Sequence, residues 1–306
     1  MKKKIFTLGL IVLIGTSILT GCQKEDKVNA STGLSVVGYA ASDKNLTILV
    51  EALTKADLID VLDGPGNFTV FAPTNDAFKA LFTQLGVSGI ADLSKEALTP
   101  ILLYHVLGTE MKSNMLATGY VSTLSPSQGN KLSLKVDVAG GVKLNKETNV
   151  TKADIDVKNG VIHLIDKVLL PPTVVDLAVA NDSFSILVQA VIKAGLAETL
   201  SGTGPFTIFA PTNSAFTALF AQLGVSGIAD LTAAQLIPIL KYHVVSGNVL
   251  SGQLTNGPVQ TLNGAINVSL SPVPTINGAA KIIATDIQGS NGVIHVIDKV
   301  LLPSSK

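Results

Sequence analysis

Four histidines are the residues of this chain whose types and spacing could carry out acid–base or metal chemistry. Tyr104-His105-Val106 reappears as Tyr242-His243-Val244, and His163 and His295 each follow the residues NGVI. A histidine can act as a general base or bind a metal ion near neutral pH. However, the chain has a single cysteine and no HExxH spacing, and apolar residues surround the histidines. We therefore expect buried, hydrogen-bonded histidines, with no catalytic residue, no metal site and no cofactor.

Two other patterns could suggest catalysis or nucleotide binding. Asp166 and Asp298 follow His163 and His295 by three residues, which in a strand places the acid and the histidine on opposite faces. The glycines at 64–66 and 202–204 come after a helical pattern and before a strand pattern, the reverse of a dinucleotide-binding turn. No nucleophile elbow of the GxSxG type follows the leader sequence. The sequence therefore predicts a protein that is not an enzyme.

These histidines lie in a part of the sequence that occurs twice. Residues 68–78 read FTVFAPTNDAF and residues 206–216 read FTIFAPTNSAF, while NGVIHLIDKVLLP at 159–171 returns as NGVIHVIDKVLLP at 291–303. The offset between copies is 138 at Phe68 and 132 at His163, so the second copy lacks six residues in the region after Val245. Each copy has the length of a folded domain of roughly 130 residues.

The duplication predicts two globular domains, at 36–171 and 173–304. The connection through Pro171-Pro172-Thr173 is short and stiff, so the domains should have restricted relative motion.

The pattern of apolar residues predicts helices first and strands second in each domain. Residues 46–62 have helical spacing, 68–71 read as a buried strand, and Thr74 or Asn75 can cap the helix that follows. Residues 131–138 alternate, with Leu132, Leu134 and Val136 on one face and Lys131, Ser133, Lys135 and Asp137 on the other. Asn159-Gly160 indicates a hairpin turn. This order favours an α+β fold with an antiparallel sheet.

The segment FAPTNDAF, the tyrosine-histidine motif and NGVIHLIDKVLLP together resemble the fasciclin domain, FAS1, and both copies carry all three. The resemblance implies two tandem fasciclin-like domains, each a wedge-like β-sandwich with flanking helices. It also implies a role in adhesion at cell surfaces or in extracellular matrix, with protein or polysaccharide partners. Because some fasciclin-like proteins bind a small apolar ligand, such as a carotenoid or another lipid, that role is the alternative.

The residues that the copies share are interpreted as a structural motif of the fold, without a catalytic role. They are Thr74, Asn75, Tyr104, His105 and His163 with their counterparts Thr212, Asn213, Tyr242, His243 and His295. Binding residues stay unassigned. Specific function is expected where the copies differ: at the six-residue length difference, at Tyr39 and Tyr120, which have no tyrosine counterpart, and in the lysine-rich first domain.

The N-terminus has the pattern of an export signal. Three lysines at 2–4 precede an apolar run over 5–19, and LTGC ends at Cys22, the only cysteine. This ending resembles a bacterial lipobox, so residues 1–21 are predicted to be a signal peptide, Cys22 to be lipidated, and 22–35 to form a flexible tether. A transmembrane anchor is the alternative, although the apolar run is short for a span.

The residues that follow Cys22 indicate where in the cell the protein is located. The sequence QKED at 23–26 resembles the surface-export signal of lipoproteins in the Bacteroidetes group. We expect a lipid-anchored protein of the outer membrane that is exposed at the surface; a periplasm-facing position is the alternative.

Charge and aromatic content limit the partners. The chain has 22 lysines and no arginine; loss of Lys2–Lys4 with the signal leaves 19 basic against 22 acidic residues, a net charge of −3. A nucleic-acid-binding protein needs a basic face, so that class is not expected. With no tryptophan and four tyrosines, few flat rings remain for stacking on sugars.

Overall fold

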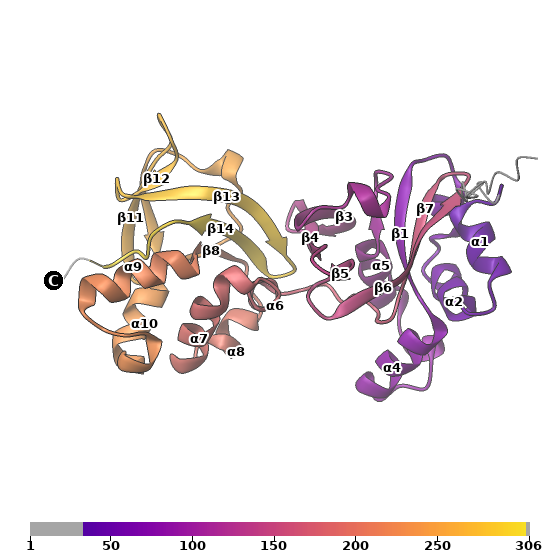
Figure 1. The fold of residues 1–306 in the computed structure, drawn as a ribbon, viewed down its shortest axis with the longest axis horizontal. Coiled ribbons are helices and arrows are strands. Elements are labelled where there is room, and N and C mark those ends of the chain that lie inside the picture. Colours follow the sequence, from indigo (N-terminus) through magenta and orange to yellow (C-terminus); the bar gives the residue numbers. More distant parts are fainter. Residues whose placement is uncertain (1–32, 304–306) are drawn as a thin grey trace, which may run out of the picture.

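The computed structural model describes residues 33–303. The predicted signal peptide, Cys22 and most of the predicted tether lie outside the described residues. Two domains follow one another and are joined through Pro171 and Pro172 (Figure 1); their elements have the same order except for an additional 3-10 helix, η3 (Asp182–Phe184), in the second domain. Between residues 33 and 303, no helix is long and apolar enough to cross a membrane.

Each domain begins with helices around one buried strand and ends with a run of strands. The elements of the first domain are α1 (Val36–Ser42), α2 (Thr47–Lys55), α3 (Ile59–Asp63), β1 (Phe68–Pro73), α4 (Asn75–Leu85), η1 (Ile90–Asp92), α5 (Lys95–Tyr104), β2 (Val106–Leu107), η2 (Ser113–Met115), β3 (Gly119–Ser127), β4 (Asn130–Asp137), β5 (Lys143–Leu144), β6 (Thr148–Val157) and β7 (Gly160–Ile165). Those of the second are α6 (Val174–Val179), η3 (Asp182–Phe184), α7 (Ser185–Lys193), α8 (Ala197–Ser201), β8 (Phe206–Pro211), α9 (Asn213–Leu223), η4 (Ile228–Asp230), α10 (Ala233–Tyr242), β9 (Val244–Ser246), η5 (Ser251–Gln253), β10 (Gly257–Thr261), β11 (Gly264–Ser269), β12 (Thr275–Ile276), β13 (Ala280–Gly289) and β14 (Gly292–Ile297).

The helix predicted over residues 46–62 is two helices, α2 and α3. The chain turns at Asp57, whose φ is +54°, and the N–H groups of Asp57 and Leu58 donate back to carbonyls in the last turn of α2. A glycine usually makes this left-handed helix end, and Gly195 does so at the corresponding position of the second domain, with φ +67°. The end of α2 was missed because an aspartate occupies the position that a glycine would have marked.

Each domain contains one seven-stranded sheet. The strand order is β2-β1-β7-β6-β5-β4-β3 in the first domain and β10-β11-β12-β13-β14-β8-β9 in the second. The α+β fold is confirmed, but one pair in each sheet departs from the antiparallel prediction, because β1 runs parallel to β7 and β8 runs parallel to β14. Nearly the whole domain separates β1 from β7 along the chain, so no hairpin forces them to be antiparallel.

The predicted hairpin between β6 and β7 is present, with its turn one residue earlier than expected. Val157 pairs with Gly160, so Lys158 and Asn159 form the turn. Gly160 is needed for a different reason, because its φ is +146° and a Cβ atom there would lie 1.9 Å from the carbonyl oxygen of Phe68. Only glycine therefore allows β1 to lie this close to the start of β7.

Each sheet has a hydrophobic core on both faces. One core of the first domain packs the helices against the sheet, for example through Leu49, Leu102 and Ile162. The other lies between β1 and β7 on one side and β4 and β5 on the other, and contains Phe71 and Leu134. The sheet folds over this second core along β6, which carries two bulges and pairs first with β5 and then with β7. The result is the sandwich flanked by helices that the fasciclin resemblance implies.

Candidate functional site

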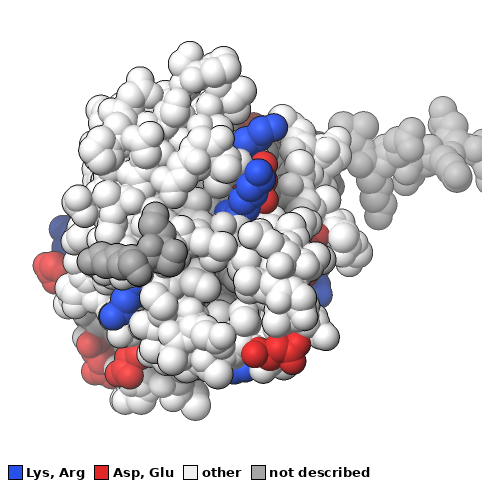
Figure 2. Space-filling model, turned by 90° about the vertical axis from the view of Figure 1, so that its left-hand side faces the viewer, with Lys and Arg blue, Asp and Glu red and all other residues white. Residues whose placement is uncertain are grey.

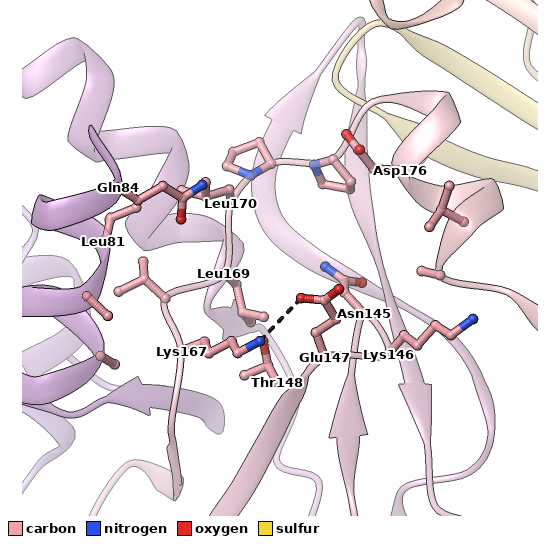
Figure 3. Close-up of a pocket in the computed structure, with 17 residues that line it drawn as sticks. Leu81, Gln84, Asn145, Lys146, Glu147, Thr148, Lys167, Leu169, Leu170 and Asp176 are labelled. Carbon is pink, nitrogen blue, oxygen red and sulfur yellow. Dashed lines mark hydrogen bonds and ion pairs between the residues drawn. The ribbon is translucent and has the colours of Figure 1, made fainter. Parts of the chain in front are cut away.

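An open cleft of about 520 Å³ lies between the two domains. Its walls are α4, the turn between β5 and β6, the connection through Pro171 and Pro172, and α6 (Figure 3). It is the site where residues of both domains and of the linker meet. Its geometry therefore depends on how the two domains are held against each other.

Three of the four charged side chains that line the cleft form ion pairs, and the fourth, Asp176, accepts hydrogen bonds from Thr173 at the start of α6. Lys167 Nζ lies 3.2 Å from Glu147 Oε2 (Figure 3), and Lys146 Nζ lies 2.7 Å from Asp182 Oδ1 of the second domain. The side chains of these two pairs are between half and four-fifths exposed, so water screens both pairs and each contributes little to stability. The cleft therefore offers balanced charges and no concentrated field that would attract an ionic substrate.

The two domains are also in direct contact, because strand β4 of the first packs against β13 of the second. The backbone N–H of Gln288 donates to Ser133 Oγ at 2.9 Å. The Gln288 side chain is buried and bonds to Asn248 and to two backbone carbonyls. Ser133 and Lys135 are 7% and 8% exposed, although the alternating sequence placed them on the outer face of β4. The second domain covers that face.

Tyr120 joins the same interface from β3. Its hydroxyl donates to the carbonyl of Leu177 at 3.3 Å and accepts from Asn181 Nδ2 at 3.2 Å. Lys135 Nζ lies 5.8 Å from the centre of its ring, and burial raises the pKa of Tyr120 to about 12. Tyr120, which has no tyrosine counterpart in the second copy, thus binds the neighbouring domain. Tyr39, the other unmatched tyrosine, packs against the helical core of its own domain.

The six-residue difference between the copies lies in the β3–β4 hairpin. Gly119 pairs with Val136 in the first domain, and Gly257 pairs with Val268 in the second, so the segment between the partners is six residues longer in the first copy. The longer tip reaches the second domain, where Ser127 Oγ donates to the carbonyl of Gly289 at 3.0 Å. The extra residues therefore extend the contact between the domains.

His105 and His243 are buried within their own domains and lie away from the cleft. The Nδ1 atoms are 2.8 Å from the carbonyls of Ile101 and Ile239, and the Nε2 atoms accept from backbone N–H groups at 2.8 and 2.9 Å. Burial lowers the pKa of each histidine to about 4. Each ring therefore stays neutral at pH 7, with both nitrogens engaged, and ties the end of a helix to the segment after the last strand.

His163 and His295 are equally buried. His163 Nε2 lies 2.9 Å from the carbonyl of Met111, and its Nδ1 accepts from the N–H of Asp154 at 3.2 Å. The Asp154 carboxylate comes within 4.0 Å of the same nitrogen, whereas Asp166 instead binds Asn149. Residue spacing does not reveal the contact between Asp154 and His163, because a bulge in β6 places the Asp154 carboxylate beside the ring. Burial lowers the pKa of both histidines.

Tyr104 and Tyr242 are buried at the second core of each domain. The Tyr104 hydroxyl donates to the carbonyl of Ser133 at 2.9 Å and accepts from Asn145 Nδ2 at 3.0 Å. Burial raises the pKa of this phenol. Asn145 also lines the cleft, and Ser133 binds the second domain, so Tyr104 connects its core to both the cleft and the interface. Tyr242 makes the equivalent bonds within the second domain.

Thr74 and Thr212 cap α4 and α9: each hydroxyl accepts from an N–H group in the first turn, at 3.3 Å. Of the two candidates that the sequence offered for the cap of α4, Thr74 is therefore the cap and Asn75 is not. The Asn75 side chain accepts from the N–H of Ile48 and donates to the carbonyl of Lys44, each at 3.0 Å. It therefore fixes the start of α4 to the start of α2, and Asn213 does the same in the second domain.

In the part of the chain that the structure describes, no group of three or more His, Cys, Asp or Glu side chains is arranged to hold a metal ion. Every buried side-chain nitrogen and oxygen described has a hydrogen-bond partner. The geometry thus supplies a fixed relation between two domains and a neutral cleft, and the residues shared by the copies hold the fold.

Known proteins with similar sequences cover one or both domains. Protein sll1483 of Synechocystis sp. is 45% identical over 141 residues, which are 46% of this chain and 76% of that protein. Periostin of Homo sapiens is 29% identical over 284 residues, 92% of this chain and 32% of periostin. Transforming growth factor-beta-induced protein ig-h3 of Sus scrofa is 33% identical over 249 residues, 80% of this chain and 36% of that protein. The chain spans about a third of the length of these two animal proteins.

Among solved structures, a FAS1 domain pair from the insect cell adhesion molecule Fasciclin I matches 87% of this chain and 96% of its own, with a TM-score of 0.48 and 19% identity. The family model described as Fasciclin domain matches residues 44–171 and 182–303. The two segments matched by the family model cover most of the chain and take in one domain each, so the chain belongs to the fasciclin family.

Proposed function

We propose that this protein is a non-enzymatic, lipid-anchored surface protein whose two fasciclin domains make adhesive contact with a protein or polysaccharide partner. The observation that carries the proposal is the fixed pair of fasciclin domains. The β4–β13 packing, the bonds of Tyr120 and the long β3–β4 hairpin hold the domains in one arrangement. A rigid pair presents its outer surface without losing domain motion on binding, which lowers the entropic cost of contact.

The direction of the chain supports a surface role. The first described helix, α1, lies at the end of the first domain that is farthest from the second (Figure 1). An anchor at Cys22 would therefore hold the first domain near the membrane and present the second domain outward. The outward end of the second domain carries few charged side chains (Figure 2). Such a surface favours contact through neutral polar and apolar groups over contact through salt-dependent charge attraction.

The non-enzymatic character is supported by the histidines. Each of the four has both ring nitrogens in hydrogen bonds to backbone groups, and the cleft between the domains contains none of them. A general base must reach the proton that it abstracts, and these rings are held inside the domains.

The anchor is tested by labelling cells with a palmitate analogue. Wild-type protein should take up the label, and the Cys22→Ala variant should not; label retained in Cys22→Ala contradicts lipidation. Protease treatment of intact cells then separates a surface position, in which the domains are digested, from a periplasm-facing position, in which they survive until the cells are opened.

Adhesion is tested with a strain that lacks the protein, complemented by the wild type or by Cys22→Ala. Attachment and biofilm matrix should fall in the deletion strain and return with the wild type only. Unchanged attachment in the deletion strain would count against the adhesive role. Binding of cells to wild-type protein on beads should change little between about 50 and 500 mM salt, because the presented end of the molecule has few charges.

A further inference from the structure

The second domain contains a partly enclosed apolar cavity of about 160 Å³. It lies between the helices α6, α7 and α8 and the sheet, on the side where Figure 1 shows these helices against the strands. Every residue that lines it is aliphatic except His243. Protein interiors are normally packed without voids of this size, so the cavity needs an explanation.

The first domain shows that the fold itself does not require this cavity. The corresponding space, between α1, α2, α3 and β1, has a volume of only about 10 Å³. At the offset of 138, Ile59 becomes Ala197 and Leu53 becomes Val191. Ile59 and Leu53 pack in the helical core of the first domain, and the smaller side chains of Ala197 and Val191 line the cavity in the second. At the same offset Val70 becomes Ile208, which adds one methylene group, so the two reductions outweigh this increase and leave the cavity.

The mouth of the cavity is also more apolar in the second domain than the corresponding surface of the first. Ile192 and Val179 line it and are 64% and 47% exposed. Their counterparts in the first domain are Thr54 and Ala41. Aliphatic side chains at the mouth of an apolar cavity suit an apolar ligand, because contact with the ligand removes them from water. The second domain thus has both an apolar interior space and an apolar rim that leads to it.

The lining defines the chemistry of what can enter. His243 is the only polar side chain there, and its two ring nitrogens already bind the carbonyl of Ile239 and the N–H of Leu301. It has no hydrogen bond to offer, so a polar group placed inside would lose its bonds to water without replacement. A dry aliphatic cavity of about 150 Å³ holds a molecule the size of benzene. A whole carotenoid is far too large to be enclosed.

We propose that this cavity binds the end of an alkyl chain, which enters between Val179 and Ile192 and leaves its polar head in water. The ligand class is therefore a fatty acid, a fatty alcohol or a lipid acyl chain. The site is separate from the contact surface proposed above and does not depend on the adhesive role.

The proposal is tested by calorimetric titration of the mature chain carrying Cys22→Ala, which has no acyl group of its own, with decanoic acid and with decan-1-ol, below their aggregation limits. One molecule of either should bind per chain, with similar affinity, because the head group stays outside. Ala197→Ile restores the side chain of the first domain and should weaken binding at least tenfold. Ala234→Ile, the same change at an exposed position of α10, should bind like the wild type.

The outcomes separate the possibilities. Equal binding by the wild type and Ala197→Ile, or no binding by the wild type, overturns the proposal. If Ala197→Ile does not fold, Val191→Leu takes its place as the variant that fills the cavity. Co-sedimentation with phosphatidylcholine vesicles distinguishes the sources of the chain: loss of vesicle binding in the filled variant indicates a membrane acyl chain, and binding of decanoate alone indicates a free fatty acid or alcohol.

Discussion

The backbone N–H of Gln288 in the second domain donates a 2.9 Å hydrogen bond to the hydroxyl of Ser133 in the first. Both residues are buried, and they bring β4 and β13 together across the domain boundary. At the offset of 132 that holds in this strand, the counterpart of Ser133 is Ala265, which is exposed. The outer face of β4 is therefore a domain interface, whereas the outer face of β11, its counterpart in the second domain, is free of the first domain.

Ser133→Ala should loosen the domain pair without unfolding the first domain. The change leaves the buried N–H of Gln288 unpaired, which costs about 1–3 kcal/mol of the free energy that couples the domains. The distribution of distances between spin labels on α4 and α9 should broaden, as measured by pulsed electron–electron double resonance. Ser122→Ala is the control, because Ser122 lies directly opposite Ser133 but is exposed. Identical distributions for Ser133→Ala and the wild type would contradict the coupling.

The sequence predicted the fold well because the repeated segments contain the residues that determine it. The FAPTN blocks, the tyrosine-histidine motif and the NGVIH segment fold each domain by contacts within that domain. The interface between the domains was not predicted, since an alternating strand shows which face is polar but not what covers that face. Ser133 and Lys135 look like solvent-facing residues in such a pattern. The signals that point to the interface in the sequence are Tyr120, which has no tyrosine counterpart, and the six additional residues of the first copy.

Contacts that depend on irregular backbone were also missed. Asp154 approaches His163 because β6 bulges, and its φ of +59° cannot be inferred from residue spacing. Asn75 looked like a helix cap because it stands at the start of α4, whereas its bonds run to α2 and the turn before it, 27 and 31 residues earlier. The cavity of the second domain could have been suspected from Ala197 and Val191, but only alignment of the two copies within the fold gives these replacements a meaning.

Gly160→Ala should severely destabilise the first domain. The new Cβ would lie 1.9 Å from the carbonyl oxygen of Phe68, so β1 and β7 would have to separate where their parallel pairing begins. We expect a loss of more than about 3 kcal/mol in the free energy of unfolding, at the high end for single substitutions. Urea denaturation measures the loss. Gly89→Ala is the control, because Gly89 has an extended backbone and open space around its Cβ position; an equal loss there would refute the steric explanation.

Asn75→Ala should cost more stability than Thr74→Ala. Loss of the Thr74 cap removes one bond to the first turn of α4 and should cost about 1 kcal/mol. Asn75→Ala removes bonds to Ile48, Lys44 and Thr47 and should cost about 2–3 kcal/mol if each contributes about 1 kcal/mol. Urea midpoints of the two variants give the comparison. A larger loss for Thr74→Ala would show that Asn75 acts mainly at the helix end after all.

Acid should unfold the protein through its buried histidines. Burial lowers the pKa of His105 and His243 from 6.5 to about 4, so between these two values the unfolded chain binds protons that the folded chain does not. The stabilising contribution is complete above pH 6.5 and is lost as the pH falls towards 4, by about 3 kcal/mol for each of the two residues. The carboxylate of Asp137, whose pKa is lowered from 3.8 by the N–H of Ala139, loses its contribution only at more acidic pH.

Urea midpoints at pH 7, 5.5 and 4.5 measure this loss. His105→Gln removes the titrating group from the first domain, so the variant should be less stable at pH 7 but should lose less stability on acidification than the wild type. His243→Gln should do the same for the second domain, which gives a matched pair. If both variants keep the full pH dependence of the wild type, the acid sensitivity resides in other groups and the buried histidines do not control it.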